Sequence, residues 1–127
     1  MTINDFPKEG LQRVLALAGS ISAMTTDDLR IFAGHIPPHI QLITLLDEIK
    51  FLEVFDYNIW AKEVGWDYVM SPATLDNSDT ETLRKLMTTH VRTNRFVEGH
   101  WDQLLLTGYI SRFLARLQEL YNEVYGQ

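Results

Sequence analysis

The last third of the chain constrains the fold most, because a helical spacing recurs on either side of two glycines. In residues 79–98 one set of side chains recurs at steps of three and four: Leu83, Leu86, Met87, His90, Val91 and Asn94. A second set follows residue 109: Ile110, Phe113, Leu114, Leu117, Leu120, Tyr121 and Val124. This spacing places each set on one face of a helix. We therefore predict two long helices, 79–98 and 109–125, that bury these faces.

Local signals indicate where these helices begin and end. Ser78 and Glu81 have the S-x-x-E spacing of a capping box, which starts a helix. Glycine lacks the Cβ atom that penalises a left-handed backbone, so Gly99 and Gly108 favour breaks. The residues between the two glycines fit about two helical turns.

The rest of the chain gives weaker helical signals. Pro37-Pro38 predicts a helix start, because proline suits the first turn of a helix. From residue 39 to about 55 the apolar side chains occur nearly all round, which is typical of a buried central helix. Residues 59–64 favour another helix, and a strand at 66–70 would lack a partner. The expected fold is all-α: a compact single domain, residues 1–127, of five or six helices with 39–56 at the centre.

Composition excludes several classes of protein. The content of 46% hydrophobic and 22% charged residues is that of a globular chain. The absence of cysteine rules out disulfides, thiolate metal ligands and a cysteine nucleophile. No window approaches the roughly 18 apolar residues of a membrane span, and the N-terminus has no secretory pattern. We expect a cytoplasmic protein with no membrane span and no cofactor.

The net charge of −6 is unevenly distributed along the chain. Residues 1–78 contain 5 Lys and Arg against 11 Asp and Glu, whereas residues 79–127 contain 6 of each. No acidic residue lies between Glu81 and Glu98, a stretch that contains Arg84, Lys85, Arg92 and Arg95. We predict one basic helix face on an otherwise acidic molecule. This balance makes nucleic acid an unlikely partner, since tight nonspecific binding needs many phosphate contacts.

The four histidines do not form an evident metal site. His90 shares the apolar face of helix 79–98, where a lone imidazole is usually a hydrogen-bonded core residue. His35 and His39 flank two prolines, so they are not the helical pair, one turn apart, that many metal sites use. We predict no metal ligand.

An arginine precedes a histidine by five residues twice, at Arg30 and His35 and at Arg95 and His100. This Arg-x4-His pair resembles the motif of HEPN-type RNA-cleaving domains, which are also small helical bundles. The resemblance implies that the arginine binds phosphate and that the histidine assists cleavage. With 7 arginines, 4 histidines and three spacings permitted by the motif, about 0.7 chance matches are expected, so the two matches are weakly informative.

The densest polar cluster contains Arg92, Arg95, Glu98, His100 and Asp102. Two interpretations stay open. In the one we favour, an arginine pairs with a neighbouring carboxylate and locks the turn. In the other, the guanidinium groups bind a carboxylate or phosphate of another molecule. The candidate binding residues are Arg84, Arg92, Arg95, Glu98, His100 and Trp101.

Six aromatic residues form a second candidate cluster: Tyr57, Trp60, Trp66, Tyr68, Trp101 and Tyr109. Most should lie in the core or at its rim, because large aromatic rings dominate core energetics. Exposure of two or three together would mark a partner surface, since Trp, Tyr and Arg are enriched at binding hot spots.

The run VRTNRFVEG and the residues after it form a longer pattern: Val91, Arg92, Asn94, Arg95, Phe96, Glu98, Gly99, Gly108, Arg116 and Leu117. This VRxNRFxEG…G…RL pattern resembles the C-terminal signature of a family of small bacterial proteins of unknown function. The resemblance covers roughly residues 40–121. It implies no catalytic residues, because the family has no agreed activity.

These observations favour a small non-enzymatic intracellular protein that binds a partner protein. The alternative is an enzyme that cleaves a phosphodiester, as in RNA, or a phosphate ester, using Arg92, Arg95 and His100. Convergence of Arg95 and His100 in a cleft would favour the enzyme. A homodimer, which is compatible with either function, would use Tyr109, Phe113 and Tyr121.

Overall fold

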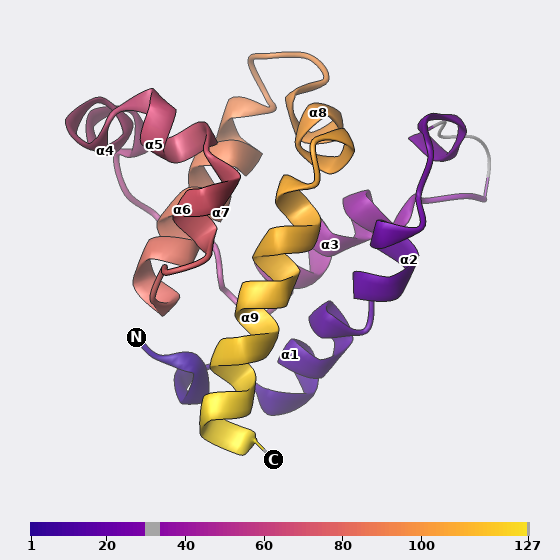
Figure 1. Cartoon of the computed structure of the whole chain (residues 1–127), viewed down its shortest axis with the longest axis vertical. Helices are drawn as coiled ribbons and strands as arrows, with labels where there is room; N and C mark the ends of the chain where they lie inside the picture. Colours follow the sequence, from indigo (N-terminus) through magenta and orange to yellow (C-terminus); the bar gives the residue numbers. More distant parts are fainter. Residues whose placement is uncertain (30–33, 127) are drawn as a thin grey trace.

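A computed structural model describes residues 1–29 and 34–126, and every regular element in these ranges is helical. Figure 1 shows the helices arranged around α9 (Tyr109–Tyr125), the yellow helix in the middle. The other elements, with η for a 3₁₀ helix, are η1 (Ile3–Asp5), α1 (Lys8–Leu15), α2 (Ala18–Ser22), η2 (Thr26–Leu29), α3 (Pro38–Glu48), α4 (Tyr57–Val64), α5 (Trp66–Met70), α6 (Pro72–Leu75), α7 (Thr80–Thr93) and α8 (His100–Leu106). The predicted all-α fold is confirmed.

Six α-helices in the described ranges have seven or more residues, and they correspond to the five or six expected helices. The remaining three, α2, α5 and α6, have only four or five residues each. Helix α5 occupies residues 66–70, so the strand considered for this segment is not formed.

The centre of the bundle is α9, not the expected helix 39–56. Helix α9 packs against α1, α2, α6, α7 and α8, and it lies between the other helices in Figure 1. Its buried face is the periodic face read from the sequence, with Tyr109, Ile110, Phe113, Leu114, Leu117 and Leu120. Because Tyr109 and Phe113 are buried within the chain itself, they are not available for the homodimer expected from them. Tyr121 is half-buried.

Helix α3 ends at Glu48, well before the expected end, because the chain turns there in a Schellman motif. Lys50 adopts a left-handed backbone with a φ of 60°. Its amide donates to the carbonyl of Asp47 (3.0 Å), and the amide of Phe51 donates to the carbonyl of Leu46 (2.9 Å). Leu46 and Phe51 are both buried, as the hydrophobic contact of this motif requires. No glycine marks this helix end, so the sequence did not reveal it.

Replacing Lys50 by glycine should stabilise the protein by up to about 1 kcal/mol, because a side chain with a Cβ atom is strained in the left-handed region. Lys50 is exposed, and the turn uses only its backbone. The matched control is Glu48→Gly, which is also exposed but right-handed, and should destabilise by about 1 kcal/mol. Chemical denaturation measures both. A loss of stability in both variants would contradict the left-handed turn.

Helix α7 begins one residue later than predicted. Its N-cap is Asp79, whose carboxylate accepts a hydrogen bond from the amide of Thr82 (2.8 Å). The predicted capping box is therefore wrong: Ser78 is buried and donates to the carbonyl of Thr74 (2.7 Å). The cap moves because Ser78 takes part in the preceding turn.

Both glycines are confirmed as breaks between helices, but α7 does not extend to the predicted residue 98. Helix α7 ends at Thr93, and a turn of residues 94–99 leads into α8. Gly99 and Gly108 both adopt a left-handed backbone, with φ of 78° and 84°. These glycines precede α8 and α9 and fix the direction in which each begins.

Candidate functional site

Arg84, which the sequence places on the basic face, is buried and paired. Its side chain is 9% exposed. It donates to the carboxylates of Glu53 (2.8 Å) and Glu81 (3.0 Å) and to the carbonyls of Phe51 (2.9 Å) and Lys50 (3.2 Å). The guanidinium group thus holds the turn after α3 against α7. The expected basic surface therefore does not include Arg84.

Trp101, another candidate binding residue, is 1% exposed. Its indole N–H donates to the carbonyl of His39 (2.8 Å), and its amide donates to the side-chain oxygen of Asn94 (2.9 Å). These bonds join α8 to α3 and to the end of α7. Trp101 is an internal anchor, so its ring does not face a partner.

The remaining charged candidates lie at the turn between α7 and α8. Arg95 and Glu98 are exposed, and Arg92 is half-buried. Neither arginine forms an ion pair with Glu98 or Asp102 in the described part of the chain. Asp102 instead lies 2.7 Å from Nε2 of the buried His39. The favoured interpretation, an arginine that locks this turn, is therefore corrected.

His100 pairs with His90, a contact that the sequence analysis did not predict. Nδ1 of His90 lies 2.9 Å from Nε2 of His100, and the two rings stack with centroids 5.1 Å apart. Nε2 of His90 lies 3.0 Å from the carbonyl oxygen of Val69, which also accepts a bond from the hydroxyl of Tyr109 (3.1 Å). His90 is fully buried, so its predicted role as a hydrogen-bonded core residue is confirmed.

These contacts fix the proton positions of the histidine pair. A carbonyl oxygen only accepts, so Nε2 of His90 carries a proton. Burial, with the neighbouring His100 as second cause, lowers the pKa of His90 to about 3. Nδ1 of neutral His90 is then the acceptor, and Nε2 of His100 is the donor. Burial lowers the pKa of His100 as well, so at neutral pH its Nδ1 carries a lone pair and no proton.

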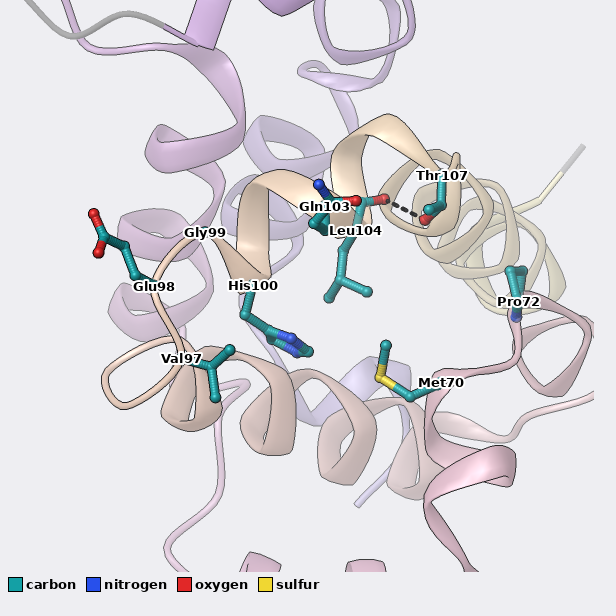
Figure 2. A pocket seen from close by; sticks show the side chains of 9 residues that line it. All are labelled: Met70, Pro72, Val97, Glu98, Gly99, His100, Gln103, Leu104 and Thr107. Atoms are coloured by element: carbon teal, nitrogen blue, oxygen red, sulfur yellow. Dashed lines mark hydrogen bonds between the residues drawn. The ribbon is translucent and has the colours of Figure 1, made fainter.

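The ring of His100 points into a cavity of about 410 Å³ between the 97–107 segment and the residues around α5 and α6 (Figure 2). Figure 2 shows the carboxylate of Glu98 directed away from this cavity. Arg92 and Arg95 do not line it, and no hydrogen bond joins Arg95 to His100 in the described residues. Arg95 and His100 therefore do not converge in this cavity, as phosphodiester cleavage by this pair would require. Arg30, and with it the first Arg-x4-His pair, lies outside the described residues.

A second hollow of about 450 Å³ lies on the other side of Val97, lined by Tyr57, Asn58, Trp66, Thr93, Phe96 and Val97. Three of these side chains are apolar and exposed: Phe96 (79%), Val97 (51%) and Trp66 (40%). We call these three residues the Phe96 surface. They come from α5 and from the turn before α8, two segments whose proximity could not be predicted from the sequence.

The six aromatic residues of the second cluster divide between core and surface. Trp101 and Tyr109 are buried, Tyr57 and Trp60 are half-buried, and Trp66 and Tyr68 are exposed. Trp66 and Tyr68 stand two residues apart on helix α5, so they face different directions and line different hollows.

Residues 1–29 and 34–126 contain neither a cluster of metal ligands nor a helix suited to a membrane. No three His, Asp or Glu side chains come together there as potential metal ligands. Each helix in these ranges is too short or too polar to cross a bilayer.

Comparison with known proteins assigns the chain to a family. Residues 37–123 match a family described as a family of unknown function (DUF6508). The matched span includes the run from Val91 to Leu117 on which the resemblance rests, so resemblance to a family of unknown function is confirmed. No curated protein and no solved structure matches the chain.

Proposed function

We propose that this chain, which belongs to the DUF6508 family of unknown function, is a non-enzymatic protein that binds a partner protein on the Phe96 surface. The observation that carries the proposal is the exposure of Phe96 beside a hollow of about 450 Å³. Single exposed apolar side chains are common on proteins. A group of them around a hollow is typical of a binding site.

The Phe96 surface has the composition of the centre of a protein interface. Such centres combine aromatic side chains with arginine, and polar residues surround them. Phe96 and Trp66 supply two rings, and the hollow between them offers room for a partner's side chain. Covering these rings would stabilise a complex, because each Å² of apolar surface removed from water contributes about 25 cal/mol.

Arg92 and Arg95 indicate that the partner presents carboxylates. They precede Phe96 closely in the sequence, and neither has an ion pair within the described ranges. On a chain with a net charge of −6, this local positive charge would direct an acidic segment to this face and to few others. We propose a partner segment with an apolar side chain for the hollow and acidic residues beside it.

Phe96→Ser should weaken partner binding by about 30-fold, which corresponds to roughly 2 kcal/mol, because the change removes a central aromatic contact. Arg95→Glu should weaken binding more at low salt than at high salt, because it reverses a charge that screening otherwise reduces. The tagged chain is isolated from its native cells, its partner is identified and purified, and the affinity of each variant is measured by titration.

Val124→Ser is the matched control, because Val124 is a comparably exposed apolar residue (46%) that lines a different hollow, near both termini. All three substitutions are at exposed positions and should leave the melting temperature nearly unchanged. If Phe96→Ser and Val124→Ser bind the partner equally well, the proposal is wrong. If the purified chain cleaves RNA or a phosphate ester, the protein is an enzyme and the proposal of a non-enzymatic function is wrong.

We also propose that the protein acts in the cytoplasm of a bacterium. This setting is supported by the resemblance to small bacterial proteins and by a sequence without cysteine, since reducing compartments do not sustain disulfides. Fractionation of the native cells, with detection of the chain in each fraction, tests this setting.

A further inference from the structure

We infer that the cavity at His100 binds a small, uncharged, largely apolar molecule that donates one hydrogen bond to Nδ1 of His100. This site goes beyond the proposed docking of a partner protein and lies next to it, since Val97 borders both hollows. Two independent observations carry the inference: the lining of the cavity, and the fixed direction of the hydrogen bonds in the histidine pair.

The cavity has the size and lining of a small-molecule site. Its volume of about 410 Å³ lies within the usual range for ligand pockets, roughly 300 to 1,000 Å³. Met70, Pro72, Val97 and Leu104 supply apolar walls. Leu104 is buried and forms part of the floor, whereas Met70 and Val97 are exposed and stand at the edge. A ligand could therefore enter from solvent and bury its apolar part.

His100 presents one hydrogen-bond acceptor to this space. Its Nε2 donates to His90, whose own Nε2 donates to the carbonyl of Val69, so the chain of bonds runs in one direction. Nδ1 of His100 has no partner among the described residues. Nδ1 of His39 also lacks a partner but is buried, whereas Nδ1 of His100 is not buried. Figure 2 shows the ring directed into the cavity. Because Nδ1 is neither bonded to a described residue nor buried, its lone pair is available to a ligand that enters.

The lining also limits the charge of the ligand. No lysine or arginine lines the cavity, so an anion would meet the lone pair of His100 without a compensating positive charge. A cation would lack a counter-ion, because the carboxylate of Glu98 points away. The hydroxyl of Thr107 donates to the carbonyl of Leu104 (3.3 Å), so its oxygen offers the ligand a further acceptor. These features select a neutral molecule with an N–H or O–H group, as in an indole or a phenol.

The test compares indole with N-methylindole, which has the same apolar ring system but no N–H donor. Each probe is titrated into the isotope-labelled full chain and followed by NMR. Indole should shift the signals of Met70, Val97, His100 and Leu104. It should bind about five to ten times more tightly than N-methylindole, which is the effect of one neutral hydrogen bond. The nitrogen resonance of His100 Nδ1 should start in the range of an unprotonated imidazole and move upfield with indole only.

Two variants separate this site from its surroundings. Met70→Trp fills the edge of the cavity without touching the histidine pair, and it should weaken both probes about tenfold or more. Phe96→Ser should leave indole binding unchanged, so the ligand site and the docking proposal can fail independently. Equal affinity for the two probes, an unmoved His100 nitrogen signal, or the absence of binding by either probe would overturn the inference.

Discussion

Replacing Arg84 by alanine is expected to lower the free energy of unfolding by about 3–5 kcal/mol, because the change breaks a buried charge cluster. The carboxylate of Glu53, 15% exposed, would lose its arginine partner (2.8 Å). The carbonyls of Lys50 and Phe51, which belong to the turn that ends α3, would lose the hydrogen bonds that Arg84 donates. A loss of this size is a large fraction of the stability of an ordinary domain.

Arg95→Ala is the matched control, since Arg95 follows the same helix but is exposed and without an ion pair in the described residues. It should change stability by no more than about 0.5 kcal/mol. Urea denaturation of the two variants beside the wild type measures the difference. If Arg84→Ala is as mild as Arg95→Ala, the guanidinium group does not hold the turn, and Arg84 returns to the candidates for binding.

Lowering the pH from about 7 to 5 is expected to destabilise the protein by about 2 kcal/mol through His90 alone. In the folded protein, burial and then His100 lower the pKa of His90 from 6.5 to about 3. Below pH 6.5 the unfolded chain therefore binds a proton that the folded chain excludes. Stability is complete above pH 6.5, falls as the pH decreases, and stops falling through His90 near pH 3. His100, whose pKa is also lowered by burial, acts in the same direction.

His90→Gln identifies the source of this pH dependence. The variant should be less stable at pH 7, because it loses the bonds to His100 and Val69, but its stability should change less on acidification. Hydrogen bonds with Glu53 and Arg84 lower the pKa of Glu81 to about 2, so Glu81 contributes only below about pH 4.5. Burial raises the pKa of Glu53, and this group acts in the opposite direction in both proteins. The difference between the wild type and the variant from pH 7 to 5 therefore reports the contribution of His90. The same decrease in both proteins would assign it to other groups.

The helices of the C-terminal third could be predicted because their signals are local. The periodic face of α9 and the left-handed glycines need no knowledge of the rest of the chain. The end of α3 could not be predicted in this way. Lys50 is not a residue type that signals a left-handed turn, and the turn is held by Arg84, more than thirty residues further on. The contact exists only after α7 packs on this segment.

In the candidate site, too, the contacts that depend on long-range packing could not be predicted from the sequence. His100 was selected because Arg95 precedes it at a fixed spacing, but the folded chain pairs it with His90 instead. That pairing requires α8 to fold back beside α7, which depends on Gly99 and the turn before it. The exposure of Phe96 could not be predicted from the polar run VRTNRFVEG around it, because a large aromatic ring is usually a core residue. Its true position depends on the 94–99 turn, which projects from the bundle in Figure 1.

The most direct test of the docking account introduces the photoreactive residue benzoylphenylalanine at position 96 of the chain in its native cells. The matched control carries the same residue at position 124, which is also exposed but remote from the Phe96 surface. Irradiation should yield one main covalent product of defined added mass at position 96 and none at position 124. A Trp66→Ser change should remove that product. The absence of a product at 96, or the same mixture of products from both positions, would contradict the account.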